Sequence, residues 1–257
     1  MDKATNPKRR QLIVGNWKMN GNLQSNEKLL EQIRAGWASN SSDEHSAEVV
    51  ICPPHAYLQS TASILKNSTI LVGGQNASEF QSGAYTGEVS AEMLEDLGCR
   101  YVIIGHNERR RMQRETNEQV AQKFIEAQRV KLIPILCVGE PSEMREQGRH
   151  LEYLDQQLEA VFSRTGCDAF KNAVIAYEPI WAVGTGKTAT PEQAHKVHHF
   201  IRKKLGGVAE AVRILYGGSV KAHNAEQLFA LKDIDGALLG GASLDAEEFL
   251  KICQAAN

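Results

Sequence analysis

The sequence lacks the two features that would direct a protein to a membrane or to nucleic acid. No apolar run approaches the roughly 20 residues that a membrane-spanning helix needs. The 29 lysines and arginines are balanced by 31 aspartates and glutamates, and the formal net charge is −2, whereas a nucleic-acid-binding domain usually has a strong basic surplus. We therefore expect a protein that neither spans a membrane nor binds nucleic acid.

Cysteines are few and have no spacing typical of a disulfide framework or a metal site. The five cysteines are scattered, their count is odd, and no CxxC occurs, so we expect free thiols in a reducing cytoplasm. The first ten residues contain no apolar stretch, which argues against a signal peptide. We expect residues 1–10 to be a short flexible lead-in and residues 11–257 to be one domain, since no linker or low-complexity segment interrupts them.

Eight short apolar runs, rich in β-branched residues, recur along the chain. Their interiors are continuously apolar rather than alternating, as in strands that are buried on both faces. The runs cover residues 11–17, 47–54, 69–76, 100–106, 131–140, 172–179, 211–218 and 235–242.

Helical patterns lie between these runs. Residues 26–38 have apolar side chains at spacings of three and four, and Thr116 with Gln119, like Thr190 with Gln193, fits a capping box at a helix start. Strands that alternate with helices predict a parallel sheet with helical crossovers. Eight such units in about 250 residues predict a closed (β/α)8 TIM barrel rather than an open sheet.

Polar side chains gather where the predicted strands end. In a barrel of this kind the active site lies at the carboxyl ends of the strands. A lysine, a histidine and a carboxylate would meet there, beside glycine-rich turns of the type that hold phosphate through backbone N–H groups. The residues at these ends are Asn16, Lys18, His106, Glu108, Arg109, Glu140 and Glu178, followed by Gly217, Gly218, Ser219, Gly240 and Gly241.

The segment after Glu178, PIWAVGTGKTATPEQ, has the glycines and lysine of a nucleotide-binding loop. A P-loop needs a glycine where this chain has Trp181. The dinucleotide fingerprint is formally met from Gly184 onward, but it should follow its strand directly, and residues 179–183 intervene. The segment then fits either a mobile lid with an apolar tip or an ordinary loop with a packed tryptophan, and the local sequence does not choose between them.

One pair of histidines has a spacing that can bind zinc. His195 and His199 are four residues apart on a predicted helix, but the glutamate of an HExxH motif is absent and no third ligand is evident. We therefore expect no metal site.

Six motifs together resemble the triosephosphate isomerase family, and the resemblance extends from Gln11 to the C-terminus. It implies a cofactor-independent and metal-independent isomerase of glycolysis and gluconeogenesis that interconverts dihydroxyacetone phosphate and D-glyceraldehyde 3-phosphate through an enediolate. The motifs are GNWKMNG, GHNERR, CVGE, AYEPIWAVGTGKTAT, YGGSV and LGGASL.

The resemblance also implies a role for each catalytic residue. Glu178 would be the base, and His106 would polarise the carbonyl as a neutral imidazole, because a helix N-terminus disfavours the imidazolium. Lys18 would supply positive charge to the phosphate and the oxyanion, and Asn16 would donate to the substrate and hold Lys18. The residues implied to bind substrate and its phosphate are Asn16, Lys18, Gly184, Ser219, Gly240 and Gly241.

The family further implies a homodimer, in which residues 73–90 would insert into the partner barrel. The expected interface residues are Met19, Gln75, Thr86, Glu88 and Arg109. One departure concerns Asn107, because the family usually has serine after the catalytic histidine. Asparagine also donates a hydrogen bond but is bulkier, so we expect activity with an altered resting position of Glu178.

Two rival functions remain open at the level of the sequence. A Schiff-base aldolase could use Lys18 as its nucleophile on a similar barrel, and borohydride trapping with substrate would then label Lys18. A barrel kept only as a binding protein would show ligand affinity without turnover, which the set of four polar residues at the barrel mouth argues against.

Overall fold

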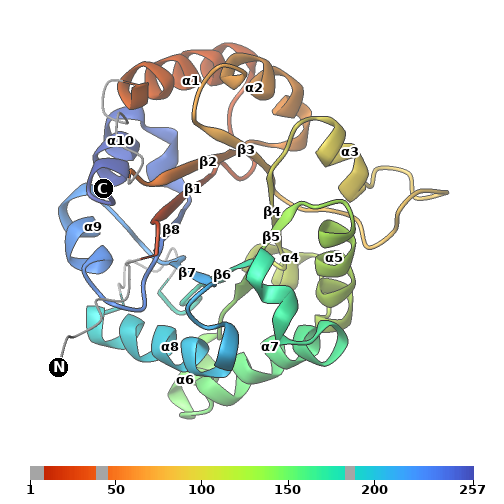
Figure 1. Ribbon diagram of the computed structural model, residues 1–257, viewed down its shortest axis with the longest axis vertical. Helices are drawn as coiled ribbons and strands as arrows, with labels where there is room; N and C mark the ends of the chain where they lie inside the picture. Colours follow the sequence, from red (N-terminus) through yellow and green to blue (C-terminus); the bar gives the residue numbers. More distant parts are fainter. Residues whose placement is uncertain (1–8, 39–45, 183–188) are drawn as a thin grey trace.

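The barrel predicted from the sequence is confirmed by the computed structural model, which describes residues 9–38, 46–182 and 189–257. Eight parallel strands form one closed sheet in chain order, and β1 closes it by pairing with β8. Helices surround this sheet on the outside (Figure 1). The strands are β1 Leu12–Asn16, β2 Glu48–Cys52, β3 Leu71–Gly74, β4 Tyr101–Ile104, β5 Ile133–Val138, β6 Val174–Tyr177, β7 Arg213–Tyr216 and β8 Gly236–Leu239.

The connections contain α-helices and short 3-10 helices. None of the helices within the described ranges is long and apolar enough to cross a membrane. The α-helices are α1 Leu23–Ala38, α2 Leu58–Leu65, α3 Ala91–Asp96, α4 Asn107–Met112, α5 Asn117–Arg129, α6 Ser142–Glu146, α7 His150–Thr165, α8 Pro191–Lys204, α9 Ala222–Phe229 and α10 Ala246–Gln254. The 3-10 helices are η1 His55–Tyr57, η2 Cys167–Asn172, η3 Gly206–Val208 and η4 Gly241–Leu244.

The continuous apolar character of the strands follows from burial on both faces. Along β1, Leu12 and Val14 point into the barrel, whereas Ile13 packs outward against the helices. Tyr101 and Ile103 of β4 point inward in the same way. Two apolar layers result, one inside the barrel and one between the sheet and its helices, and both exclude water from the strands.

The predicted helix starts have the expected hydrogen bonds. Thr116 and Gln119 form a complete capping box at the start of α5, and Thr190 and Gln193 form another at α8. Pro191 occupies the first position of α8, where its missing N–H leaves no helical hydrogen bond unmade. These caps fix where two helices begin after loops on the carboxyl side of the barrel.

The last two residues of the expected lead-in, Arg9 and Arg10, contact the barrel. Residues 1–8 lie outside the described ranges, but Arg9 donates to Asp235 at 2.7 Å and pairs with Glu210 at 2.9 Å. Arg10 donates to the carbonyl of Ser46 at 2.9 Å. The last two residues of the segment therefore contact the barrel, because their guanidinium groups find acceptors on it.

Candidate active site

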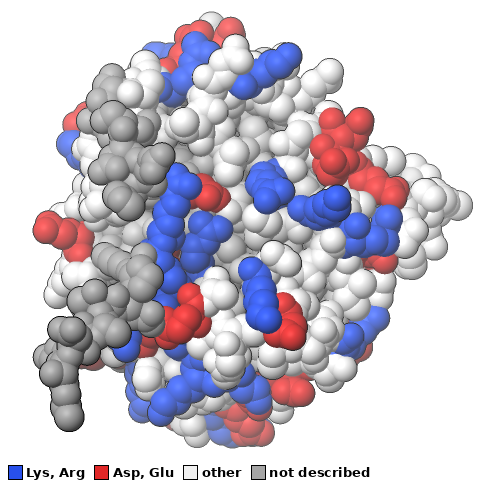
Figure 2. Space-filling view, in the orientation of Figure 1, with Lys and Arg blue, Asp and Glu red and all other residues white. Residues whose placement is uncertain are grey.

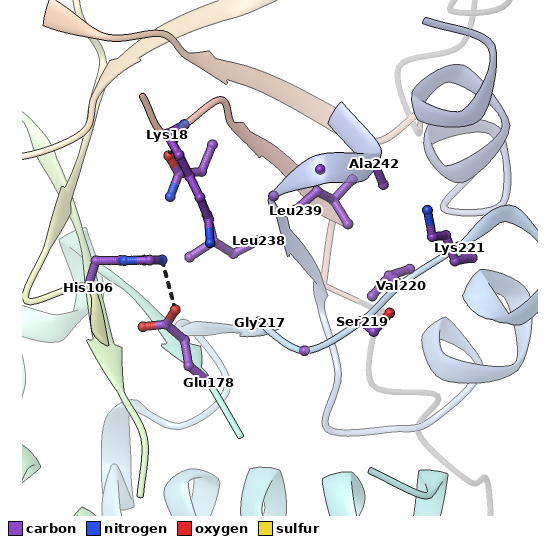
Figure 3. Close-up of a pocket in the computed structure, with 14 residues that line it drawn as sticks. Lys18, His106, Glu178, Gly217, Ser219, Val220, Lys221, Leu238, Leu239 and Ala242 are labelled. Atoms are coloured by element: carbon purple, nitrogen blue, oxygen red, sulfur yellow. Dashed lines mark hydrogen bonds and ion pairs between the residues drawn. The ribbon is translucent and has the colours of Figure 1, made fainter. Parts of the chain in front are cut away.

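A cavity of about 300 Å³ lies at the carboxyl ends of the strands, where the sequence predicted the site. Residues that follow β1, β4, β6, β7 and β8 meet in it (Figure 3). The cavity is lined by Asn16, Lys18, His106, Glu178, Gly217, Gly218, Ser219, Val220, Lys221, Leu238, Leu239, Gly240, Gly241 and Ala242.

Lys18 has a left-handed backbone, with φ of 53°, which is uncommon for a residue with a side chain. Two hydrogen bonds hold it there. The side-chain oxygen of Asn16 accepts the Lys18 N–H at 3.0 Å, and the side-chain amide of Gln75 donates to the Lys18 carbonyl at 3.0 Å. The end of β1 thus fixes the direction in which the lysine enters the cavity.

The ammonium group of Lys18 already has a partner inside the chain. Its Nζ lies 2.6 Å from Oε1 of Glu108, in the first turn of α4. The structure thus places the Glu108 carboxylate beside the lysine that the sequence predicted at the site. The pair is partly exposed, with Lys18 at 30% and Glu108 at 41% side-chain exposure, so substrate can still approach the ammonium group.

Glu178 follows β6 directly and is buried, at 3% exposure. Its Oε1 accepts from Nδ2 of Asn107 at 2.5 Å and lies 2.9 Å from Nε2 of His106, and its Oε2 accepts the Asn107 N–H at 3.0 Å. Burial raises the pKa of the carboxyl group, but His106 and the two Asn107 donors outweigh burial and lower it below its ordinary value. In this resting arrangement the carboxylate is a stabilised anion.

His106 caps the N-terminus of α4, and its Nδ1 accepts the backbone N–H of Glu108 at 3.3 Å. A ring nitrogen that accepts a hydrogen bond has no proton, so this arrangement corresponds to a neutral ring with its proton on Nε2. Burial lowers the pKa of His106, but the facing Glu178 carboxylate raises it above its ordinary value. Glu178 is the main cause of the upward shift, and the Glu108 carboxylate, 3.6 Å from Nδ1, contributes to it.

The opposite part of the cavity is lined by small residues. A side chain at Gly217 would lie 2.9 Å from Cγ of Glu178, so glycine lets the two loops approach closely. Ser219 follows β7, and Gly240 and Gly241 follow β8 and lead into η4. Backbone near a short helix start, with few side chains in front of it, suits an anion.

Comparisons with known proteins agree with this geometry. The family model described as triosephosphate isomerase matches residues 11–256. A triosephosphate isomerase of Nitrosococcus oceani is 54% identical over 96% of this chain and 98% of its own. Relatives of the same name from Nitrosomonas europaea and Dechloromonas aromatica are each 52% identical, over 95% and 97% of this chain and 97% and 100% of theirs.

The chain belongs to the triosephosphate isomerase family. Seven of the residues expected from the resemblance line one cavity, namely Asn16, Lys18, His106, Glu178, Ser219, Gly240 and Gly241. Gly184, the remaining phosphate-site residue expected, lies outside the described residues, as do Val183 and Gly186 of the expected lid.

The start of the segment expected to be a lid is anchored to the barrel. Glu140, fully buried, accepts from Nε1 of Trp181 at 2.8 Å, from the Tyr177 hydroxyl at 3.0 Å and from Arg145 at 3.0 Å. The Arg145 guanidinium also lies 4.7 Å from the centre of the Trp181 ring. Glu140 thus connects the loop after β6 to Arg145 through an ion pair.

The residues expected at a dimer interface lie on one side of the site. Met19 is 95% exposed beside a groove that Gln75 and Arg109 also line. Thr86 and Glu88 are exposed on the segment between β3 and α3, which projects from the barrel (Figure 1). Within the chain Arg109 pairs with Glu115 at 2.5 Å, and the interface role of these five residues stays a prediction.

Of the pair His195 and His199 on α8, His199 has a carboxylate partner rather than a metal. Nδ1 of His199 lies 3.0 Å from Oδ2 of Asp233, and the rings of His195 and His199 are 6.1 Å apart. Among the described residues, no group of three or more histidines, cysteines and carboxylates is arranged to hold a metal ion.

Two features of the site were missed in the sequence. The Lys18–Glu108 pair joins residues 90 positions apart, and no local pattern indicates it. Lys221 also lines the cavity. It could have been predicted from the sequence, because it lies two residues after Ser219 in a loop that was expected to hold phosphate.

Proposed function

We propose that the protein interconverts dihydroxyacetone phosphate and D-glyceraldehyde 3-phosphate by moving one proton between adjacent carbons through an enediolate. The observation that carries the proposal is the buried Glu178 carboxylate, 2.9 Å from Nε2 of His106, in a cavity whose other side is formed by Ser219 and glycines. This combination supplies a base, a hydrogen-bond donor for an oxyanion and an anion site.

Glu178 is the base in this proposal. Its resting partners, His106 and Asn107, lower its pKa, so the carboxylate is ionised at neutral pH. When it leaves these donors to reach a substrate carbon, burial is no longer offset, and the loss of solvation makes it a stronger base. Catalysis therefore requires the carboxylate to exchange its resting hydrogen bonds for contact with the substrate.

His106 polarises the carbonyl and stabilises the enediolate. The Glu108 N–H directed at Nδ1 favours the proton on Nε2, and Nε2 becomes free to donate to a substrate oxygen once Glu178 moves away. A neutral donor positioned before the reaction can stabilise the developing oxyanion without solvent reorganisation.

Lys18 and Asn16 complete the reacting end. The ammonium group of Lys18 faces the cavity and stabilises negative charge on the substrate, and Asn16 keeps the lysine backbone in its left-handed conformation. Backbone N–H groups at Ser219, Gly240 and Gly241 would receive the phosphate. The proposed reaction needs neither metal nor organic cofactor, because no electrons leave the substrate and its phosphate is not transferred.

We also propose that the protein is a cytoplasmic homodimer. The tip of the projecting segment, with stacked Phe80 and Tyr85, has no charged side chain (Figure 2), and the groove beside exposed Met19 and Met112 could receive it. The five cysteines are free, which fits a reducing compartment. Sedimentation equilibrium at micromolar concentration should give twice the chain mass, and a monomer would contradict the dimer.

The rival Schiff-base aldolase is disfavoured by the position of Lys18. An amine nucleophile must have its nitrogen free to attack a carbonyl, whereas Nζ of Lys18 is held in an ion pair, 2.6 Å from Oε1 of Glu108. A coupled assay of D-glyceraldehyde 3-phosphate isomerisation tests the proposal directly. Turnover without borohydride labelling of Lys18 is expected, and absence of turnover in the pure, folded protein would refute the isomerase function.

A further inference from the structure

The charges around the reacting end of the cavity do not favour a dianion. Glu178 is an ionised carboxylate there, and the Glu108 carboxylate lies against the ammonium group of Lys18 at 2.6 Å. Two carboxylates thus oppose one ammonium group. A triose phosphate has about two negative charges at neutral pH, so a further cation beside the cavity would strengthen the attraction of the substrate.

Lys221 is placed to be that cation. Among the described residues that line the cavity, it is the lysine other than Lys18. It lies in the loop between β7 and α9, two residues after Ser219, and across the cavity from Lys18 (Figure 3). It is exposed, and within the described part of the chain no carboxylate pairs with it.

We propose that Lys221 adds to Lys18 a second positive charge that attracts the substrate's phosphate dianion and keeps it at the Ser219 end of the cavity. This inference rests on the proposed isomerase function and assigns the substrate-recruiting charge within that site. A free ammonium group near the entry of an anion raises both the encounter rate and the affinity. Because Lys221 lies across the cavity from His106 and Glu178, it acts on substrate and transition state alike and so affects KM rather than kcat.

The loop around Lys221 does not depend on the lysine side chain for its structure. The backbone N–H of Lys221 donates to the side chain of Asn224 at 2.8 Å, and the N–H of Ala222 donates to Glu248 at 3.0 Å. Substitution of the side chain therefore leaves the start of α9 intact and removes one charge. Lys221→Met keeps the length and the apolar stem.

A matched control variant separates the effect of a charge at the cavity from the effect of the protein's net charge. Lys66 is exposed between α2 and β3, at the amino ends of the strands, and it also has no carboxylate partner among the described residues. Lys66→Met changes the net charge by the same amount far from the cavity. At low ionic strength we expect Lys221→Met to lower kcat/KM for glyceraldehyde 3-phosphate about threefold to tenfold, whereas Lys66→Met leaves it within error.

Two further measurements show whether Lys221→Met acts through the lost charge or through a structural change. The loss in Lys221→Met should shrink as salt is added, because the Debye length falls from about 10 Å at 0.1 M to about 3 Å at 1 M. The ratio of kcat/KM for glyceraldehyde 3-phosphate to that for unphosphorylated glyceraldehyde should fall by the same factor. Lys221→Arg should restore most of that ratio.

The experiment has clear contrary outcomes. Equal kcat/KM values for Lys221→Met and Lys66→Met would overturn the inference, and so would an equal loss on both substrates, which would indicate a structural role. Calorimetric titration of inorganic phosphate into the wild type and Lys221→Met needs no turnover. It should show weaker binding to the variant, and unchanged phosphate affinity would refute the inference even if the isomerase proposal itself failed.

Discussion

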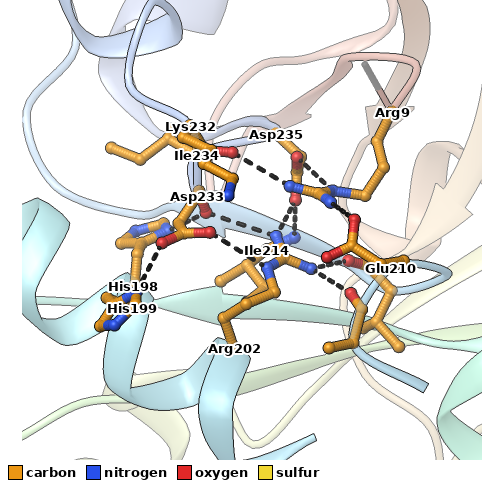
Figure 4. Close-up of polar contacts among 12 residues, drawn as sticks. Arg9, His198, His199, Arg202, Glu210, Ile214, Lys232, Asp233, Ile234 and Asp235 are labelled. Atoms are coloured by element: carbon orange, nitrogen blue, oxygen red, sulfur yellow. Dashed lines mark hydrogen bonds and ion pairs between the residues drawn. The ribbon is translucent and has the colours of Figure 1, made fainter. Parts of the chain in front are cut away.

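Buried carboxylates occur at both ends of the barrel, and their partners differ. Glu178, at the carboxyl end, is in contact with a histidine and with two donors of Asn107. Asp235, which precedes β8 at the amino end, accepts from Arg9 at 2.7 Å, from Arg202 and from the Ile214 N–H at 2.8 Å (Figure 4). One carboxylate has donors that can be exchanged, and the other has two permanent cations.

The arginine network at the amino end ties distant parts of the chain together. Arg202, in the last turn of α8, also donates to the carbonyls of Ala209 and Val212. A buried pair of this kind is costly to break, because removal of one partner leaves an unpaired charge. At the site, by contrast, the proposed mechanism requires Glu178 to leave its partners in every catalytic cycle. The comparison indicates that the carboxylate at the amino end stabilises the barrel. The carboxylate at the carboxyl end, Glu178, stays free to change its hydrogen-bond partners.

A second amino-end cluster fills the interior of the barrel. The Tyr101 hydroxyl contacts Glu48 and accepts from Arg213 at 2.6 Å, and the same arginine lies 3.7 Å from Glu48. Burial raises the pKa of Tyr101 to about 12, so the phenol stays protonated and donates to the carboxylate. This end of the barrel is thus closed by side chains that satisfy one another.

The largest expected effect is loss of catalysis at the carboxyl end. Glu178→Gln keeps the size of the side chain but removes the base, so kcat should fall roughly 10²- to 10⁴-fold. No arginine loses a partner, and thermal unfolding should show a smaller loss of stability than Asp235→Asn. Retention of wild-type kcat in a steady-state assay would show that Glu178 is not the base.

The same chemical change at the other end should have the reverse effect. Asp235→Asn removes a carboxylate from between Arg9 and Arg202 and should destabilise the barrel by about 3 kcal/mol, or roughly 10 °C in melting temperature. Asp168→Asn is the control, because its ion pair with Lys171 is exposed and worth little. The kcat of folded Asp235→Asn should stay near that of the wild type, and a catalytic loss without a stability loss would contradict the division between the two ends.

A smaller effect is expected from substitution of Asn107, the hydrogen-bond donor that stands where the family usually has serine. The Asn107 side chain helps to lower the pKa of Glu178, so Asn107→Ala should raise that pKa. The acidic limb of the pH profile of kcat/KM should then move to higher pH by less than about one unit. Asn107→Ser retains a donor and should show little shift. Because the substrate's own ionisation is common to all variants, a profile unchanged in Asn107→Ala would count against this role.

Residues whose position follows from a local pattern could be placed from the sequence. The apolar runs predicted all eight strands, and the rule that barrel sites lie at strand ends brought Asn16, Lys18, His106 and Glu178 into one cavity. Hydrogen bonds within a few residues, such as the capping boxes of α5 and α8, were also predictable. In each case the geometry depends on the chain near the residue or on one repeated unit.

Contacts that depend on how distant loops meet could not be predicted. Arg9 and Asp235 are 226 positions apart, and Arg202 and Asp235 are 33 apart, with nothing in either segment to indicate the pairing. For the same reason Arg9 was assigned to the flexible lead-in, and the pairing of Glu108 with Lys18 was missed. Long polar side chains can pair only once the closed barrel has brought their segments together. Their pairing is therefore a result of the fold and is not encoded in a local pattern.

The left-handed backbone of Lys18 has a consequence for the thermodynamics of binding. A residue with a side chain is less stable by about 1–3 kcal/mol in a sparsely populated backbone conformation of this kind, and Asn16 and Gln75 hold it there without a ligand. The conformational entropy of ordering this lysine is therefore lost when the chain folds. If the substrate binds Lys18 as proposed, it loses less entropy on binding, so more of its electrostatic attraction to Lys18 appears as affinity.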